Sequence, residues 1–253
     1  MAYIELNALS VCLSGTFESC IFMPESRDLQ RGKAFPVIWY IPEDGDSPYG
    51  ILKYANLLEQ LAVQNKYFII VSAVGHSLCT DMVWGTKNET FLSKECVEIF
   101  RFLYPLSSKP EENIIMGIGT GAYGACKLAL HHPDMFGTGI AIEGELDLAA
   151  QCESLQKGQQ EKEVRFPFQS RASLEAIFGD LGAVAGSRND LFVAAKESAG
   201  KLRLLCGKDS PVYRENTRLA ELNPNIKTVI SEDSEDEKTL VEKLLMQFCK
   251  NVP

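Results

Sequence analysis

The chain has few histidines, few basic residues and no long apolar run. Its three histidines all lie within the first 132 of 253 residues, and its net charge is -9. Nucleic acid and anionic membranes attract clustered Lys and Arg, so neither is expected as a partner. No stretch approaches the roughly 20 apolar residues that cross a bilayer, and the first residues do not resemble a secretory signal. These absences predict a cytoplasmic protein.

Cysteine is present but never forms a Cys-x-x-Cys pair. The eight cysteines are scattered, most of them inside apolar runs. Free thiols that serve as small core residues fit this pattern better than disulfides or a zinc site. The sequence therefore predicts neither a cofactor nor a bound metal.

Apolar runs and helical patterns alternate along the chain. The strand-like runs are Val37 to Ile41, Phe68 to Ala73, Asn113 to Met116, Gly139 to Ile142 and Leu202 to Cys206. Helical spacing marks Ile51 to Asn65, Phe91 to Leu103, Ala122 to His131 and Arg214 to Leu222. This alternation is typical of a doubly wound, mainly parallel sheet. We expect one α/β domain over residues 1–253, since the length suits a single core.

Two further segments have distinct patterns. Residues 4–13 and 16–23 flank a Ser14-Gly15 turn signal and predict an antiparallel hairpin at the edge of the sheet. Residues 149–170 are polar and weakly periodic, and we expect them to form an excursion that covers the cleft.

The segment Asn113 to Ala125 has the pattern of a nucleophile elbow. An apolar strand leads into the glycine-rich turn Gly117-Ile118-Gly119-Thr120-Gly121, and a helix follows. In the usual G-x-S-x-G form, the middle residue is the serine that attacks an ester carbonyl. Here that residue is Gly119, which has no side chain. The sequence thus predicts the turn without its nucleophile.

With these elements placed, the chain resembles bacterial tributyrin esterases, within the esterase D and S-formylglutathione hydrolase group. The resemblance extends from about residue 5 to about residue 250. It rests on Ser72 to Ser77, Thr80 to Met82, Trp84-Gly85, Thr90 to Leu92, the elbow through Leu130, Pro133 to Phe136, Gly144 to Leu148, Phe178 to Lys196, Cys206 to Asp209 and Tyr213 to Asn216. It implies an α/β-hydrolase fold, descent from enzymes with a Ser-His-Asp triad, and a homo-oligomer.

The triad that the resemblance implies is degenerate at several positions. Gly119 stands at the nucleophile, and gap-free matching places Asp236 at the histidine. The carboxylate position falls on Ser210, with Asp209 one residue earlier. The oxyanion loop, where the family carries His-Gly, reads Pro42 to Asp46 with the acids Glu43 and Asp44. An aspartate of ordinary pKa cannot replace the imidazole base near neutral pH. We expect no ordinary triad esterase activity.

Several acidic residues follow predicted strands and could share one cleft, where such folds bind ligands. They are Glu43, Asp44, Glu143, Asp209 and Asp236. Together they could bind a hard cation or a cationic metabolite. The simpler interpretation, which we favour, is that they are solvated loop acids. Further ligand-binding candidates are His76, Gly119 and Thr120, whereas His131 and His132 are expected to complement a helix C-terminus.

Three functions remain open from the sequence. The favoured one is a catalytically inactive pseudo-hydrolase that binds a small molecule or a protein, which requires a closed pocket beside Gly119. A hydrolase with a rebuilt carboxylate site requires acids within hydrogen-bonding reach of one another. A structural partner of an active esterase, or of a second copy, requires an exposed apolar patch.

Overall fold

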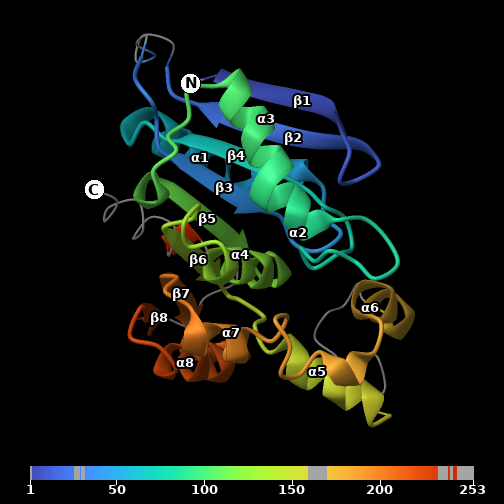
Figure 1. Cartoon of the computed structure of the whole chain (residues 1–253). Helices are drawn as coiled ribbons and strands as arrows, with labels where there is room; N and C mark the ends of the chain where they lie inside the picture. The colour runs from blue at the N-terminus through green and yellow to red at the C-terminus, as the bar shows by residue number, and fades with distance from the viewer. Residues whose placement is uncertain are drawn as a thin grey trace.

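The computed structural model describes residues 2–25, 29, 32–158, 170–232, 239, 242 and 243. Its centre is an eight-stranded sheet in the order β1-β2-β4-β3-β5-β6-β7-β8 (Figure 1). The strands are β1 Ala2–Ser10, β2 Gly15–Met23, β3 Val37–Ile41, β4 Phe68–Ser72, β5 Asn113–Ile118, β6 Thr138–Ile142, β7 Leu202–Gly207 and β8 Ile226–Ser231. β1 and β2 run antiparallel to their neighbours, and all other pairs are parallel. The expected sheet and edge hairpin are confirmed.

The helices surround this sheet. They are η2 Pro48–Tyr54, α1 Ala55–Gln64, α2 Asn88–Thr90, the π-helical η3 Phe91–Glu95, α3 Cys96–Leu103, η4 Pro110–Glu112, α4 Thr120–His131, α5 Leu148–Gln156, α6 Arg171–Phe178, η6 Leu181–Ala183, α7 Leu191–Glu197 and α8 Tyr213–Glu221. The four helical segments expected from the sequence are all found. None of the described helices is long and apolar enough to cross a membrane.

Part of the segment 149–170, predicted as an excursion over the cleft, lies within the described residues. Its first part is the helix α5, whose buried residues Leu148, Cys152 and Leu155 recur at helical spacing. The polar residues between them hid this pattern in the sequence. Residues 159–169 lie outside the described part, so a covering role over the cleft stays a prediction.

The core lies on both faces of the sheet because neighbouring residues of each buried strand point to opposite sides. In β3, Val37, Trp39 and Ile41 belong to the cluster on one face, whereas Ile38 and Tyr40 belong to the cluster on the other. The helices α3 and α4 contribute to the first cluster and α1 to the second.

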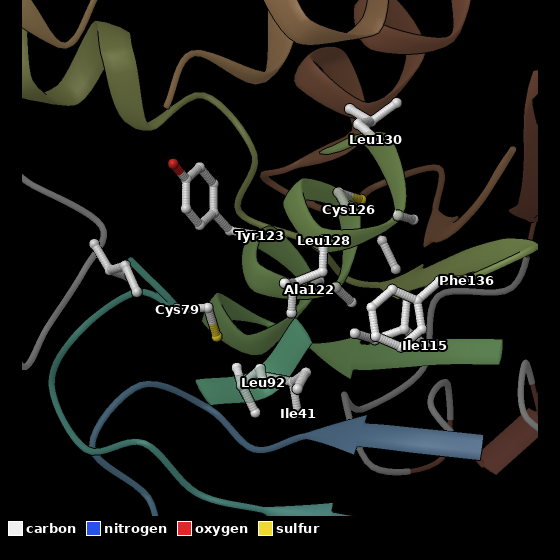
Figure 2. Close-up of a cluster of buried hydrophobic side chains, with 14 of the residues drawn as sticks. Ile41, Cys79, Leu92, Ile115, Ala122, Tyr123, Cys126, Leu128, Leu130 and Phe136 are labelled. Carbon is white, nitrogen blue, oxygen red and sulfur yellow. The ribbon is translucent and has the colours of Figure 1, made fainter. Parts of the chain in front are cut away.

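Among the helices in the described part of the chain, α4 is the most deeply buried. Every residue from Thr120 to Leu130 is buried, and Figure 2 shows side chains of α4 packed with Ile41, Ile115 and Phe136. The Tyr123 hydroxyl donates a hydrogen bond to the Asn189 carbonyl at 2.6 Å. The helix α4 is therefore held between the sheet and the segment that precedes α7.

Candidate functional site

The turn between β5 and α4 has the geometry of a nucleophile elbow. Gly119 joins the strand to the helix with φ 54° and ψ -121°, a backbone conformation that side chains rarely adopt. Its N–H donates to the Ile142 carbonyl at 3.0 Å, and its carbonyl accepts from Ala122 and Glu145 at 3.2 Å each. The turn is thus fixed by backbone hydrogen bonds that need no side chain at Gly119.

The flanking glycines explain why the turn is so tight. A Cβ on Gly117 would lie 2.2 Å from the Gly121 carbonyl oxygen, and a Cβ on Gly121 would lie 2.5 Å from the Ile41 carbonyl oxygen. Both contacts are with backbone, which cannot move aside cheaply. Helix and strand can approach this closely because neither residue has a side chain.

Glu43 lies above Gly119, in the space where the nucleophile of an active relative would start. A Cβ added to Gly119 would lie 2.8 Å from Glu43 Oε2 and 3.3 Å from Glu43 Cδ. Glu43 follows β3, its side chain is 35% exposed, and its Oε1 is 4.0 Å from Lys53 Nζ. The elbow therefore carries a carboxylate from the neighbouring loop.

Asp44, the next residue, is buried and fastens two loops together. Its Oδ1 accepts hydrogen bonds from the Ser77 and Leu78 amides at 2.9 and 2.8 Å. Its own amide donates to Thr120 Oγ1 at 2.8 Å. In α/β-hydrolases an amide of this loop helps to bind the oxyanion. Here the Asp44 amide is bonded within the chain, to the Thr120 hydroxyl.

His76 lies beside the same loop. Its Nδ1 is 3.2 Å from Asp44 Oδ2, and about half of its side chain is exposed. The ring packs over Gly45, where an added Cβ would lie 2.0 Å from Cε1. Among the described residues, no serine, threonine or cysteine side chain forms a hydrogen bond with a histidine ring. No nucleophile and imidazole pair is therefore found in this part of the chain.

A small hollow lies at the elbow. It is lined by residues 42–44, Val74, Gly75, Leu78, Cys79 and the first turn of α4, and its volume is about 10 Å³, roughly the room of one water molecule. Burial raises the pKa of the Cys79 thiol to about 12. That thiol stays protonated at neutral pH and is a poor nucleophile.

The remaining acidic candidates lie at the ends of β6 and β7. Glu143 has φ 48°, and its Oε1 accepts from the Gly207 amide at 2.7 Å. The Ser210 hydroxyl donates a short hydrogen bond to Glu143 Oε2. Asp209 is exposed, and Asp236 lies outside the described residues. Ser210, which gap-free matching assigns to the triad carboxylate, thus itself forms a hydrogen bond with a carboxylate.

The structure joins these candidates into two groups. Glu43, Asp44, His76, Gly119 and Thr120 meet at the elbow, whereas Glu143 and Ser210 form a separate pair. Within the described residues, no three His, Cys, Asp or Glu side chains are arranged to hold a metal ion. Asp44 and Glu143 instead accept hydrogen bonds from nearby loops. The expectation of solvated acids is therefore wrong for Asp44, which is buried because it accepts hydrogen bonds from the amides of Ser77 and Leu78.

Sequence reasoning missed a buried ionic cluster at the far end of α4. Glu89 Oε2 is 3.1 Å from the fully buried Lys127 Nζ, and Glu89 Oε1 is 3.1 Å from His131 Nδ1, 3.4 Å from His132 Nε2 and 2.5 Å from Arg188 Nη2. The two histidines thus have Glu89 as their partner in addition to the helix terminus. The sequence does contain a sign of this cluster. Lys127 lies within the apolar run of α4, and a buried cation requires a counter-charge.

Solved structures that share this fold include two serine hydrolases. Fluorophosphonate-binding serine hydrolase F of Staphylococcus aureus has a TM-score of 0.79 and 21% identity, with 98% of both chains covered. The S-formylglutathione hydrolase of the same organism has a TM-score of 0.77, also at 21% identity and with 98% of both chains covered. These likenesses show that the chain has the α/β-hydrolase fold.

Sequence comparison gives a shorter match. The acetyl esterase of Caldicellulosiruptor saccharolyticus is 28% identical over 151 residues, which cover 56% of this chain and 54% of that protein. The chain thus spans about half the length of this curated relative. No family model matches the sequence.

Proposed function

We propose that this esterase-like α/β-hydrolase is a pseudo-hydrolase that binds a ligand or a protein partner and does not cleave esters. The proposal rests on one observation at the elbow. Gly119 offers no hydroxyl, and the Glu43 carboxylate occupies the adjoining space. Acyl transfer on this scaffold needs a nucleophile at that point.

The electrostatics of the elbow support the same proposal. Acyl transfer builds negative charge on the substrate oxygen, and hydrolases stabilise it with donors aimed at that oxygen. Here a carboxylate lies at the elbow, and the Asp44 amide is already bonded to Thr120. Repulsion between Glu43 and the developing oxyanion would oppose the reaction even if a hydroxyl were supplied.

The histidines support it as well. His131 and His132 are held at Glu89, and His76 faces Asp44. A base must lie within hydrogen-bonding reach of the proton that it removes. The exposed portions of Glu43 and His76 are instead the groups that a bound molecule would meet beside Gly119.

The test is covalent labelling with a fluorophosphonate, which reacts with activated serines whatever ester the enzyme prefers. Wild type, Gly119→Ser and Gly119→Ser/Glu43→Gly are compared by intact mass and by p-nitrophenyl acetate turnover, with an active esterase as the positive control. We expect no adduct in wild type and no turnover above background in Gly119→Ser. The double variant removes the carboxylate but supplies no imidazole, so it should also be inactive.

Two results would contradict the proposal. A fluorophosphonate adduct on the wild-type chain would reveal a nucleophile elsewhere. Wild-type turnover that Glu43→Gln abolishes, without loss of folding, would instead favour a hydrolase built on the Glu43 carboxylate.

A further inference from the structure

The outer edge of β1 is a long strand edge that no other strand of the described part covers. β1 pairs only with β2, in an unbroken register from Ala2 opposite Met23 to Ser10 opposite Gly15. Proteins usually protect such an edge with Pro, Lys, a bulge or a very short strand, because its free N–H and C=O groups pair readily with another strand. β1 is 9 residues long, contains neither Pro nor Lys, and carries Glu5 as its one charge.

We infer that this edge is a self-association surface, on which β1 of a second copy of the chain pairs antiparallel about a two-fold axis at Leu6. The two sheets would then continue into one. The inference concerns an edge remote from Gly119 and does not depend on the proposed function.

The sequence of β1 is complementary to itself in this register. Of all two-fold registers, the one centred on Leu6 aligns all 9 residues of the strand. It places Tyr3 opposite Leu9, Ile4 opposite Ala8 and Glu5 opposite Asn7 of the second copy. Residues opposite one another in an antiparallel pair share a face of the sheet, so apolar residues meet apolar residues on both faces.

Burial and charge select the same register. Ile4, Leu6 and Ala8 already pack against the core on one face, and the second copy would extend this apolar stretch, with Ser10 opposite Ala2 at each end. On the other face, Leu9 is 79% exposed and would be covered by Tyr3. Centring on Glu5 would place two glutamates directly opposite each other, which is destabilising. Such an isologous contact is also self-limiting, since it closes at two copies.

The first measurement is sedimentation velocity of the wild-type chain over a wide range of concentration. We expect a reversible shift from the 28.0 kDa monomer to a species of twice that mass. Hydrogen exchange should show β1 amides that become more protected as the concentration rises.

Two variants at exposed positions test the register. Asn7→Glu would create two Glu–Glu pairs across the axis and should raise the dimer Kd about tenfold, since each cross-strand pair contributes a fraction of a kcal/mol to about 1 kcal/mol. Asn7→Glu/Glu5→Lys turns both into Glu–Lys pairs and should bring the Kd back to the wild-type value or below. In both variants the glutamate at position 7 lies opposite Glu18 of the same monomer. Any effect of this contact on monomer stability is therefore common to both, and the double variant is a matched control.

The inference fails if wild type stays monomeric throughout. It also fails if a dimer forms whose Kd is the same in both variants, because the contact would then lie elsewhere. Circular dichroism and melting temperatures of the three proteins establish that each is folded.

Discussion

At the scale of single residues, Gly119 shows that the elbow persists without its hydroxyl. The flanking contacts at Gly117 and Gly121 hold helix and strand so close that the backbone between them keeps φ 54°. The turn is therefore a property of packing around the glycines. A side chain at this position would be strained whether or not it served catalysis.

Gly119→Ala should lower the free energy of unfolding by about 1 to 3 kcal/mol, the usual cost of a side chain in such a conformation. Contact with Glu43 adds to that strain. Gly75→Ala is the matched control, because Gly75 has φ +57° and no atom within 4 Å of an added Cβ. Urea unfolding of both variants separates the cost of backbone strain from the cost of the contact with Glu43.

The same pair of variants tests the placement of Glu43. Gly119→Ala should be the more destabilised of the two, and adding Glu43→Ala should reduce the difference. Equal stability of the two single variants would mean that the carboxylate does not crowd Gly119.

At the scale of elements, the Glu89 cluster ties three segments together. Glu89 lies on α2, Lys127 and His131 on α4, and Arg188 just before α7. Lys127 also donates to Thr80 Oγ1 at 2.7 Å, in the loop that lines the hollow at the elbow. One buried carboxylate thus secures the far end of the elbow helix and the loop beside it.

Glu89→Gln should be strongly destabilising, by about 3 to 5 kcal/mol, because it leaves the buried Lys127 cation without its counter-charge. Arg188→Gln serves as the control, since that side chain is 62% exposed and exposed ion pairs contribute at most about 1 kcal/mol. Chemical denaturation compares the two. A loss below about 1 kcal/mol for Glu89→Gln would contradict the buried pair.

The cluster also predicts how stability depends on pH. Burial raises the pKa of Glu89, but the hydrogen bond with His131, the neighbouring His132 ring and the charges of Lys127 and Arg188 prevail and lower it below its usual range. The unfolded chain then binds more protons than the folded one, so stability rises with pH in this range. The contribution of Glu89 should be present above about pH 4.3 and be lost as the pH falls below that value.

Unfolding experiments between pH 6 and pH 3 check this expectation. Wild type should lose more stability over the acid range than Glu89→Gln, which has no carboxylate to protonate at that site. Parallel curves for the two proteins would show that Glu89 does not titrate as the cluster requires.

Element prediction from the sequence succeeded where strands are buried on both faces. Val37–Ile41 and Phe68–Ser72 are buried throughout, and such continuous apolar runs are easy to recognise. β8 escaped notice because Ile226 is its one buried residue. The short helices α6 and α7 bury only two residues each, too few to give a clear period.

At the scale of the whole molecule, the sequence predicted where the segments of the candidate site lie, but it did not predict the hydrogen bonds that their side chains form. The resemblance placed the elbow, the loop at Glu43 and the strand ends correctly, since these follow from the topology. It could not show that Asp44 bonds the amides of Ser77 and Leu78, more than 30 positions away. Backbone donors have no signature in a sequence, so acids that hold loops look the same as acids that hold ligands.

The cysteines give a prediction for the folded chain as a whole. The seven in the described part are free, as expected from the sequence. Burial raises the pKa of Cys79, Cys96, Cys152 and Cys206 to about 12. These four thiols should resist iodoacetamide at neutral pH in the native protein and react after unfolding. Peptide mapping by mass spectrometry measures both states, and native labelling at any of the four would contradict the packing.

The buried carboxylate of Asp44 makes an evolutionary change at this loop difficult to reverse. Under the proposed function, an ancestor that had lost only its serine could regain it through one codon. Once Asp44 had become the anchor of Ser77 and Leu78, a return to a small residue there would strip two amides of their acceptor before any benefit of catalysis was felt. Reversal by single mutations therefore meets a barrier at this loop, and a laboratory reversal of the proposed loss calls for exchange of the entire loop in addition to a nucleophile and an imidazole.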